Sequence, residues 1–155
     1  MRQLTITLFT LVITSLFSIR ATAQDYRFAL GLRLSNSTPT LNSSVSGRYF
    51  ITERSAVEGL VSFGSRFGAG ALLELYNDFS TPGLRWFYGG GIYVGFQDKV
   101  SYVGPTGIIG LDYTFQEAPI NISVDWKPEL DISPDINFVP DAFAVSIRFT
   151  IPKKH

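Results

Sequence analysis

The chain of 155 residues contains no cysteine and one histidine, His155, at its end. The absence of cysteine excludes disulfides, thiolate metal sites, cysteine nucleophiles and a lipid-carrying N-terminal cysteine. Thirteen basic residues match thirteen acidic ones, and the only Lys/Arg run is Lys153-Lys154. Because a nucleic-acid binder needs a basic patch or stripe, we expect no nucleic-acid partner. The protein must be held together by packing and hydrogen bonds alone.

Long hydrophobic runs are also missing. The apolar N-terminal stretch Leu4 to Ile19 is shorter than the ~20 residues of a spanning helix, which disfavours an N-terminal membrane anchor. It follows Arg2, and the small-x-small motif Ala21-Thr22-Ala23 comes after it, before Gln24. This pattern predicts a secretory signal peptide over residues 1–23, cleaved after Ala23. The mature chain, 24–155, is then one domain with a small negative net charge.

Alternation of apolar and polar residues is what the sequence has in abundance, and alternation is typical of strands with one greasy face. Turn-forming residues separate the alternating segments, and the prolines fall in these connections, because proline lacks a ladder donor. Pro128 is the exception and predicts a bulge or bend. We expect eight strands, at about 26–34, 43–52, 56–65, 68–77, 84–97, 106–116, 120–127 and 143–151.

The direction of the polar face separates a soluble barrel from a membrane barrel, which places its apolar residues outward. A matched set of six basic and six acidic residues on that face suggests ion pairing across a narrow lumen, because charges removed from water need partners. A charge-balanced soluble exterior is the alternative. Small residues crowd the same face and make room for large ones. The predicted lumen network consists of Arg27, Arg33, Arg48, Glu58, Glu74, Arg85, Asp112, Asp125, Lys127, Glu129, Asp131 and Arg148.

Aromatic residues gather at the strand ends, as in the interfacial girdles of membrane barrels, although aromatics favour strands in any case. We therefore predict an all-β fold, an eight-stranded antiparallel up-and-down transmembrane β-barrel. A wide aqueous channel needs roughly 16 or more strands, so we expect little or no conduction. With the N-terminus on the periplasmic side, one girdle holds Tyr26, Tyr49, Trp86, Tyr88, Tyr113, Phe115 and Phe149, and the other holds Phe63, Phe96 and Phe143.

Three segments carry a family resemblance: WFYGGGIYVG at 86–95, GIIGLDYTFQEAPINISVDWKPELDI at 107–132 and FAVSIRFTI at 143–151. They resemble a family of small, largely uncharacterised outer-membrane β-barrel proteins of Bacteroidetes-type bacteria, similar in architecture to the OmpX and OmpA barrels. The resemblance covers essentially the whole mature chain. It implies a bacterial outer-membrane location, and it supplies no catalytic residues. Such barrels commonly end on an aromatic residue, whereas Phe149 is followed here by Thr150 to His155.

For a protein of this kind we expect outer-membrane lipid and lipopolysaccharide as neighbours. We also expect insertion by the barrel-assembly machinery, and a monomer. These partner assignments concern the mature chain, 24–155.

Catalytic and cofactor chemistry finds little support in the sequence. A serine mechanism needs a histidine base nearby, and the terminal His155 is a poor candidate. The glycines at 68–71 and 88–95 match no phosphate-binding fingerprint, so no cofactor is predicted. The acidic residues of the seventh strand, with Asp112, could bind a cation, but pairing with Lys127, Arg148 or Arg33 is preferred, so we predict no metal.

Three hypotheses follow. The leading one is a non-enzymatic outer-membrane barrel with a structural, barrier or surface-interaction role. The second is a barrel that binds or modifies lipid A or a small amphiphile, which requires a ligand-sized gap and an unpaired polar cluster. The third is a secreted, soluble, lipocalin-like binder, which requires an apolar interior.

Overall fold

The computed structural model describes residues 26–35, 40–140 and 143–153. The predicted signal peptide and His155 lie outside these residues. No helix long and apolar enough to cross a membrane occurs in the described part of the chain. The strands are β1 (Tyr26–Ser35), β2 (Ser44–Phe50), β3 (Ser55–Phe63), β4 (Phe67–Asp78), β5 (Leu84–Gln97), β6 (Val100–Thr114), β7 (Ile120–Trp126), β8 (Glu129–Asp131), β9 (Asn137–Val139) and β10 (Phe143–Pro152).

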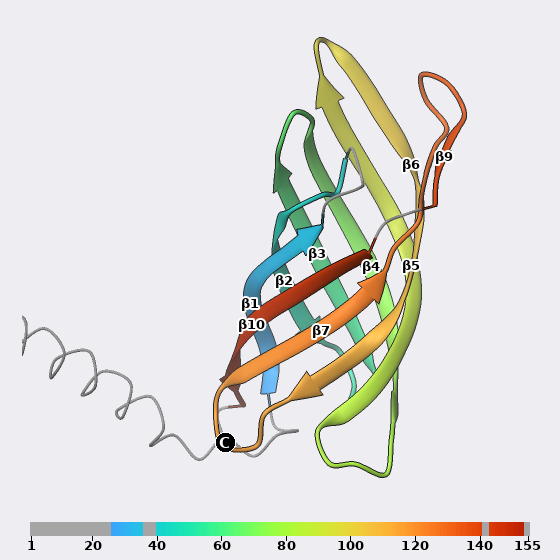
Figure 1. Ribbon diagram of the computed structural model, residues 1–155. Helices are drawn as coiled ribbons and strands as arrows, with labels where there is room; N and C mark the ends of the chain where they lie inside the picture. The colour runs from blue at the N-terminus through green and yellow to red at the C-terminus, as the bar shows by residue number, and fades with distance from the viewer. Residues whose placement is uncertain (1–25, 36–39, 141–142, 154–155) are drawn as a thin grey trace, which may run out of the picture.

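Eight of these strands close into an antiparallel barrel. The order in the sheet is β5-β4-β3-β2-β1-β10-β7-β6, and pairing of β5 with β6 completes the ring. In Figure 1 the red β10 lies beside the blue β1, so the first and last strands share one ladder. The predicted all-β barrel of eight antiparallel strands is therefore confirmed.

The two ends of the barrel differ. At the end that we call the terminal end, β1 begins, β10 ends, and the connections 51–54, 79–83 and 115–119 join neighbouring strands. At the opposite end, the hairpin end, β5 and β6 meet in a long hairpin (Figure 1). The short β8–β9 hairpin extends the sheet beyond β6 at this same end.

The β5–β6 hairpin is longer than predicted. Asp98 and Lys99 form its turn, and both have positive φ, 49° and 66°, which suits the right-handed twist of the flanking strands. Pairing begins directly beside the turn, at Gln97 and Val100, so β6 starts at Val100 rather than at residue 106. The prediction that Pro105 lies in a connection was wrong, because Pro105 lies within β6.

The seventh predicted strand is divided. β7 ends at Trp126, and β8 starts at Glu129 after the predicted bend at Pro128. The region between the predicted seventh and eighth strands, which was expected to be a connection, contains β9, which pairs with β8.

A bulge shifts the register of the pairing at the beginning of β1. The pairing with β10 shifts between Tyr26 and Phe28, so residues before and after the shift do not follow one alternation. Tyr26 is buried against the Phe50 ring, with centroids 5.3 Å apart, and Arg27 is exposed. The predictions that Arg27 lies in the lumen and that Tyr26 belongs to an outer aromatic girdle were therefore wrong.

Apart from this bulge, the barrel wall has an apolar outer surface and a charged interior. Leu32 and Ile147 are exposed by 56% and 51%, whereas their chain neighbours Arg33 and Arg148 are exposed by 0% and 1%. Inward glycines allow close packing of the wall: a Cβ at Gly91 would overlap the carbonyl oxygen of Ala71 on β4. The glycine at this position lets β4 and β5 approach each other closely, whereas any larger residue would hold the two strands apart.

Candidate functional site: the charged interior

The interior holds eleven of the twelve charged residues predicted to form the lumen network. Nearly all of them are 0–4% exposed, and the side chain of Arg85 is 12% exposed. Arg27 is outside, and its guanidinium carbon lies 5.9 Å from the centroid of the outward Tyr49 ring. Because a charge buried without a partner costs several kcal/mol, the interior must pair its charges.

Arg48 is the centre of one group of these charges, which lies nearer the terminal end. Its guanidinium contacts three carboxylates, Asp112 at 2.7 Å and Glu58 and Glu74 at 3.2 Å each. All four side chains are at most 1% exposed. With Arg85 and Arg148 they form the terminal cluster, which contains three basic and three acidic residues.

Arg148 extends the terminal cluster across the barrel. It reaches Glu58 at 2.6 Å and donates hydrogen bonds to the Ser46 and Ser123 hydroxyls at 2.7 and 2.8 Å. Glu58 therefore bridges two arginines, Arg48 and Arg148. Asn121 adds an amide donor to Asp112 at 2.9 Å, and the sequence analysis did not select this buried side chain.

An aromatic layer, formed by Phe50, Tyr76 and Phe87, lies between the terminal cluster and the terminal end of the barrel. Tyr76 donates a hydrogen bond to Glu74 at 2.6 Å, and its ring is stacked on Phe87 with centroids 5.1 Å apart. The Arg85 guanidinium lies 4.6 Å from the Tyr76 centroid and 4.9 Å from the Phe50 centroid, which is cation–π geometry. The layer caps the charged interior on the side of the terminal end.

The remaining interior charges lie nearer the hairpin end and form the hairpin cluster. Arg33 holds Asp125 in a two-pronged contact, with N–O distances of 2.6 and 3.3 Å. Lys127 contacts Glu129 at 2.6 Å. The cluster has three basic and three acidic members: Arg33, Arg66, Asp125, Lys127, Glu129 and Asp131.

The connection after β1 enters the barrel mouth and forms part of the hairpin cluster. Leu41 is fully buried; its carbonyl accepts a hydrogen bond from Arg33 at 3.2 Å, and its N–H donates one to Glu129 at 3.1 Å. The Thr40 carbonyl accepts a hydrogen bond from the Ser62 hydroxyl. This short segment, residues 40–41, acts as a plug over the ion pairs.

Arg66 is the buried cation that the sequence analysis missed. It was assigned to a turn, yet it is only 7% exposed and lies 3.5 Å from Asp131. It also donates a hydrogen bond to the Thr40 hydroxyl at 2.7 Å, and its guanidinium carbon lies 3.2 Å from the Tyr102 ring centroid. With Arg27 outside, Arg66 restores the interior to six positive and six negative charges.

Lys127 lies in the connection between β7 and β8, with its side chain buried in the interior. Burial lowers the pKa of its ammonium group to about 8, and the Glu129 carboxylate opposes that shift. The Glu129 and Asp125 carboxylates therefore both favour the charged form of this side chain.

The acidic residues considered for a cation site each have a basic partner. Asp112 pairs with Arg48, Asp125 with Arg33 and Glu129 with Lys127. Asp131 pairs with Arg66 and accepts a hydrogen bond from Tyr93 at 2.8 Å. No group of three or more potential metal ligands occurs among the described residues. The clusters do not offer three free ligands to an ion.

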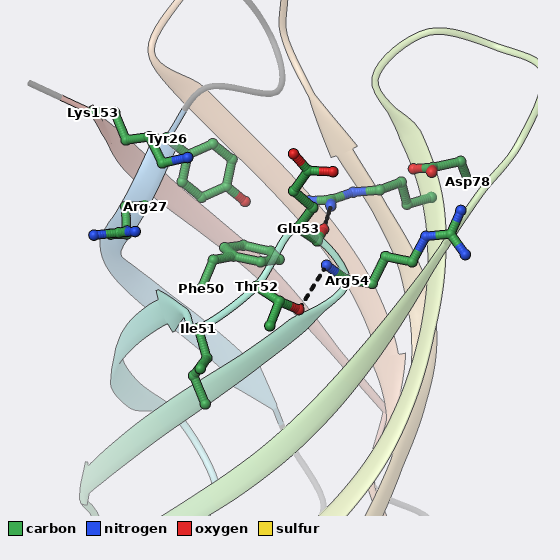
Figure 2. A pocket seen from close by; sticks show the side chains of 10 residues that line it. Tyr26, Arg27, Phe50, Ile51, Thr52, Glu53, Arg54, Asp78 and Lys153 are labelled. Atoms are coloured by element: carbon green, nitrogen blue, oxygen red, sulfur yellow. Dashed lines mark hydrogen bonds between the residues drawn. The ribbon is translucent and has the colours of Figure 1, made fainter. Parts of the chain in front are cut away.

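A basin of about 570 Å³ opens at the terminal end, on the far side of the aromatic layer (Figure 2). Its wall includes the rings of Tyr26 and Phe50, and the Arg85 guanidinium donates a hydrogen bond to the Glu53 carbonyl oxygen at 3.4 Å. Four basic and two acidic residues line it: Arg27, Arg54, Arg85, Lys153, Glu53 and Asp78.

Comparison with known proteins adds no family to this description: no protein-family model and no curated protein matches the chain. The fold and interior therefore define only a class, a closed eight-stranded antiparallel β-barrel with an apolar exterior and an ion-paired interior.

Proposed function

We propose that this chain is a monomeric β-barrel protein of a bacterial outer membrane, with a structural, barrier or surface-interaction role and little or no conduction. One observation carries the proposal: the barrel exposes its aliphatic side chains and buries its charges. In water this arrangement is unfavourable, because it leaves many large apolar groups solvated. Facing acyl chains, the same outer surface is stable.

The outer surface supports the proposal along several strands. Val124 and Leu111 are each 51% exposed and Leu73 is also 51% exposed, whereas the inward Asp125 and Asp112 are at most 2% exposed. A lipocalin-like binder would instead need an apolar interior around a ligand space. The soluble alternative is therefore less favoured.

Outward aromatics lie near both ends of the wall, as expected at the two membrane–water interfaces. Tyr49, Tyr88 and Tyr113 are exposed toward the terminal end. Trp126, exposed at the hairpin end, was missing from the predicted girdle. Toward that end, Phe63, Phe67, Phe96 and Phe143 are exposed as well.

Passage to the outer membrane requires export, and the proposal includes cleavage of residues 1–23 as a signal peptide. It also includes membership of the Bacteroidetes-type barrel family, insertion by the barrel-assembly machinery, and contact with outer-membrane lipid and lipopolysaccharide. The C-terminal strand β10 offers Phe149, 63% exposed, as the outward aromatic nearest the chain end.

The interior supports a barrier rather than a channel. The terminal cluster, the hairpin cluster and the plug at residues 40–41 occupy successive levels of an eight-stranded barrel, whose interior is only wide enough for side chains. The carboxylates of the two clusters are held by buried basic side chains, as expected for a set of structural ion pairs. This favours the non-enzymatic role over modification of lipid A.

Fractionation of cells that express the full chain tests the membrane proposal. We expect recovery with the outer-membrane fraction, resistance to carbonate extraction, and faster migration of the unheated protein in SDS gels. A chain without residues 2–23 is the matched control and should stay in the cytoplasm. Recovery of the full chain in a detergent-free periplasmic extract would contradict the proposal.

A further inference from the structure

The basin at the terminal end carries charges that the interior clusters do not neutralise. No carboxylate lies within 4 Å of the basic groups of Arg27, Arg54 or Lys153 among the described residues. These cations border a concave space rather than a flat surface. Because Arg85 already has Asp112 as its carboxylate partner, the basin has three basic groups without such a partner against two acidic ones.

Arg85 adds a cation that is already held in place. Its guanidinium lies on the Phe50 and Tyr76 rings, and its side chain is only 12% exposed. Its carboxylate partner, Asp112, lies 3.9 Å away and is also bound to Arg48 at 2.7 Å. A guanidinium offers five donors, so Arg85 retains donors for another acceptor.

Arg54 lies on the 51–54 connection, next to Glu53, whose carbonyl oxygen accepts the hydrogen bond from Arg85. Its backbone N–H donates to the Thr52 hydroxyl at 3.2 Å, and no hydrogen bond joins its guanidinium to another described residue (Figure 2). Figure 2 shows the Arg54 side chain extending toward Asp78 and the Arg27 and Lys153 side chains on the opposite side of the basin. A ligand in the basin would meet cations from both sides.

We propose that this basin binds a small phosphate ester. Planar guanidinium groups bind phosphate oxygens through paired, charge-assisted hydrogen bonds. The volume of about 570 Å³ is in the range of small-molecule sites. The Tyr26 and Phe50 rings provide an apolar side for the organic part of the ester. Only the compartment that the basin faces rests on the proposed function; the site itself depends on the geometry of the barrel end.

Two sources can supply this chemistry, a free phosphorylated metabolite and a lipid headgroup. Glycerol 3-phosphate represents the first and short-chain phosphatidylglycerol the second, with inorganic phosphate as the minimal probe and chloride as the blank. Calorimetric titration of the folded barrel in an uncharged detergent measures each Kd. The NMR shifts of the Arg54 and Arg85 Nε–H groups locate the ligand.

We expect Arg54→Gln to weaken binding of the phosphate probe by about tenfold, the cost of one charge-assisted hydrogen bond. Lys99→Gln removes the same charge at the hairpin end and should leave the Kd unchanged. Asp78→Asn removes a repelling carboxylate and should tighten binding by about threefold at low salt.

Absence of binding by all three probes would overturn the inference, and so would equal effects of Arg54→Gln and Lys99→Gln. If only the glycerol phosphate binds, the source is a free metabolite; if the lipid binds more tightly, the source is a headgroup. The titration does not need a membrane, so a chain that fractionates as soluble is titrated without detergent. The two proposals therefore fail independently.

Discussion

The two ion clusters inside the barrel are built from different parts of the chain. In the terminal cluster every charged residue lies on a barrel strand, with Arg48 and Glu58 directly opposite each other on β2 and β3. In the hairpin cluster only Arg33 and Asp125 do. Arg66 and Lys127 lie in connections, and Glu129 lies on the short β8. Both clusters nevertheless contain three charges of each sign.

Charge balance is therefore a property of the interior and not of the strand pattern. A wall strand fixes the direction of each side chain, so its inward charges meet partners at set heights. A connection has no such constraint, so its charged side chains can turn inward and pair with an interior charge of the opposite sign. We expect the wall-built cluster to tolerate loss of a member less well than the connection-built one.

Arg48→Met should have the largest effect, because it leaves Glu58, Glu74 and Asp112 buried with one cation fewer. We expect a loss of about 3–5 kcal/mol in the free energy of unfolding, the usual cost of breaking a buried pair from one side. Urea unfolding in detergent micelles, followed by loss of the fast-migrating form in unheated gels, measures it. Arg48→Lys keeps the charge and should lose less. Equal stability of Arg48→Met and the wild type would show that these carboxylates need no arginine.

Arg33→Met makes the corresponding change in the hairpin cluster, and we expect a smaller loss of about 2 kcal/mol. Lys127 lies on the same side of the barrel and can compensate part of the charge on Asp125. The same urea titration compares the two variants. A loss larger than that of Arg48→Met would reverse the proposed ranking of the clusters.

The direction of the side chains on the barrel strands could be predicted from the sequence. A period of two residues sorts Leu32 from Arg33 and Ile147 from Arg148, and the closed barrel follows from eight such segments. The bulge between Tyr26 and Phe28 could not be read this way, because nothing in the alternation marks an extra residue. It moved Tyr26 inward and Arg27 outward.

The connections were the other source of error. Arg66 follows Ser65 in a turn, where an arginine is normally solvated, so its burial has no local signal. The charge count offers an indirect signal. Once Arg27 is excluded, the predicted interior has one cation fewer than it has anions, so another basic side chain is expected to be buried there. Leu41 is similar, since its burial depends on Gly70, where a Cβ would meet the Leu41 side chain.

Arg66→Gln gives the smallest of the three effects and tests this exchange of cations. The variant leaves Asp131 with the Tyr93 hydroxyl as a donor, and Arg66 is itself near the mouth, so we expect a loss of about 1 kcal/mol. Arg27→Gln, which removes an equal charge from the outside, is the matched control and should leave the urea midpoint unchanged. If stability depends on the net charge of the interior, Arg66→Gln combined with Asp131→Asn should be more stable than Arg66→Gln alone, because the double variant has a neutral interior again. A double variant that is less stable to urea than the single variant would mean that Arg66 acts through its contacts with Tyr102 and Thr40 rather than through charge.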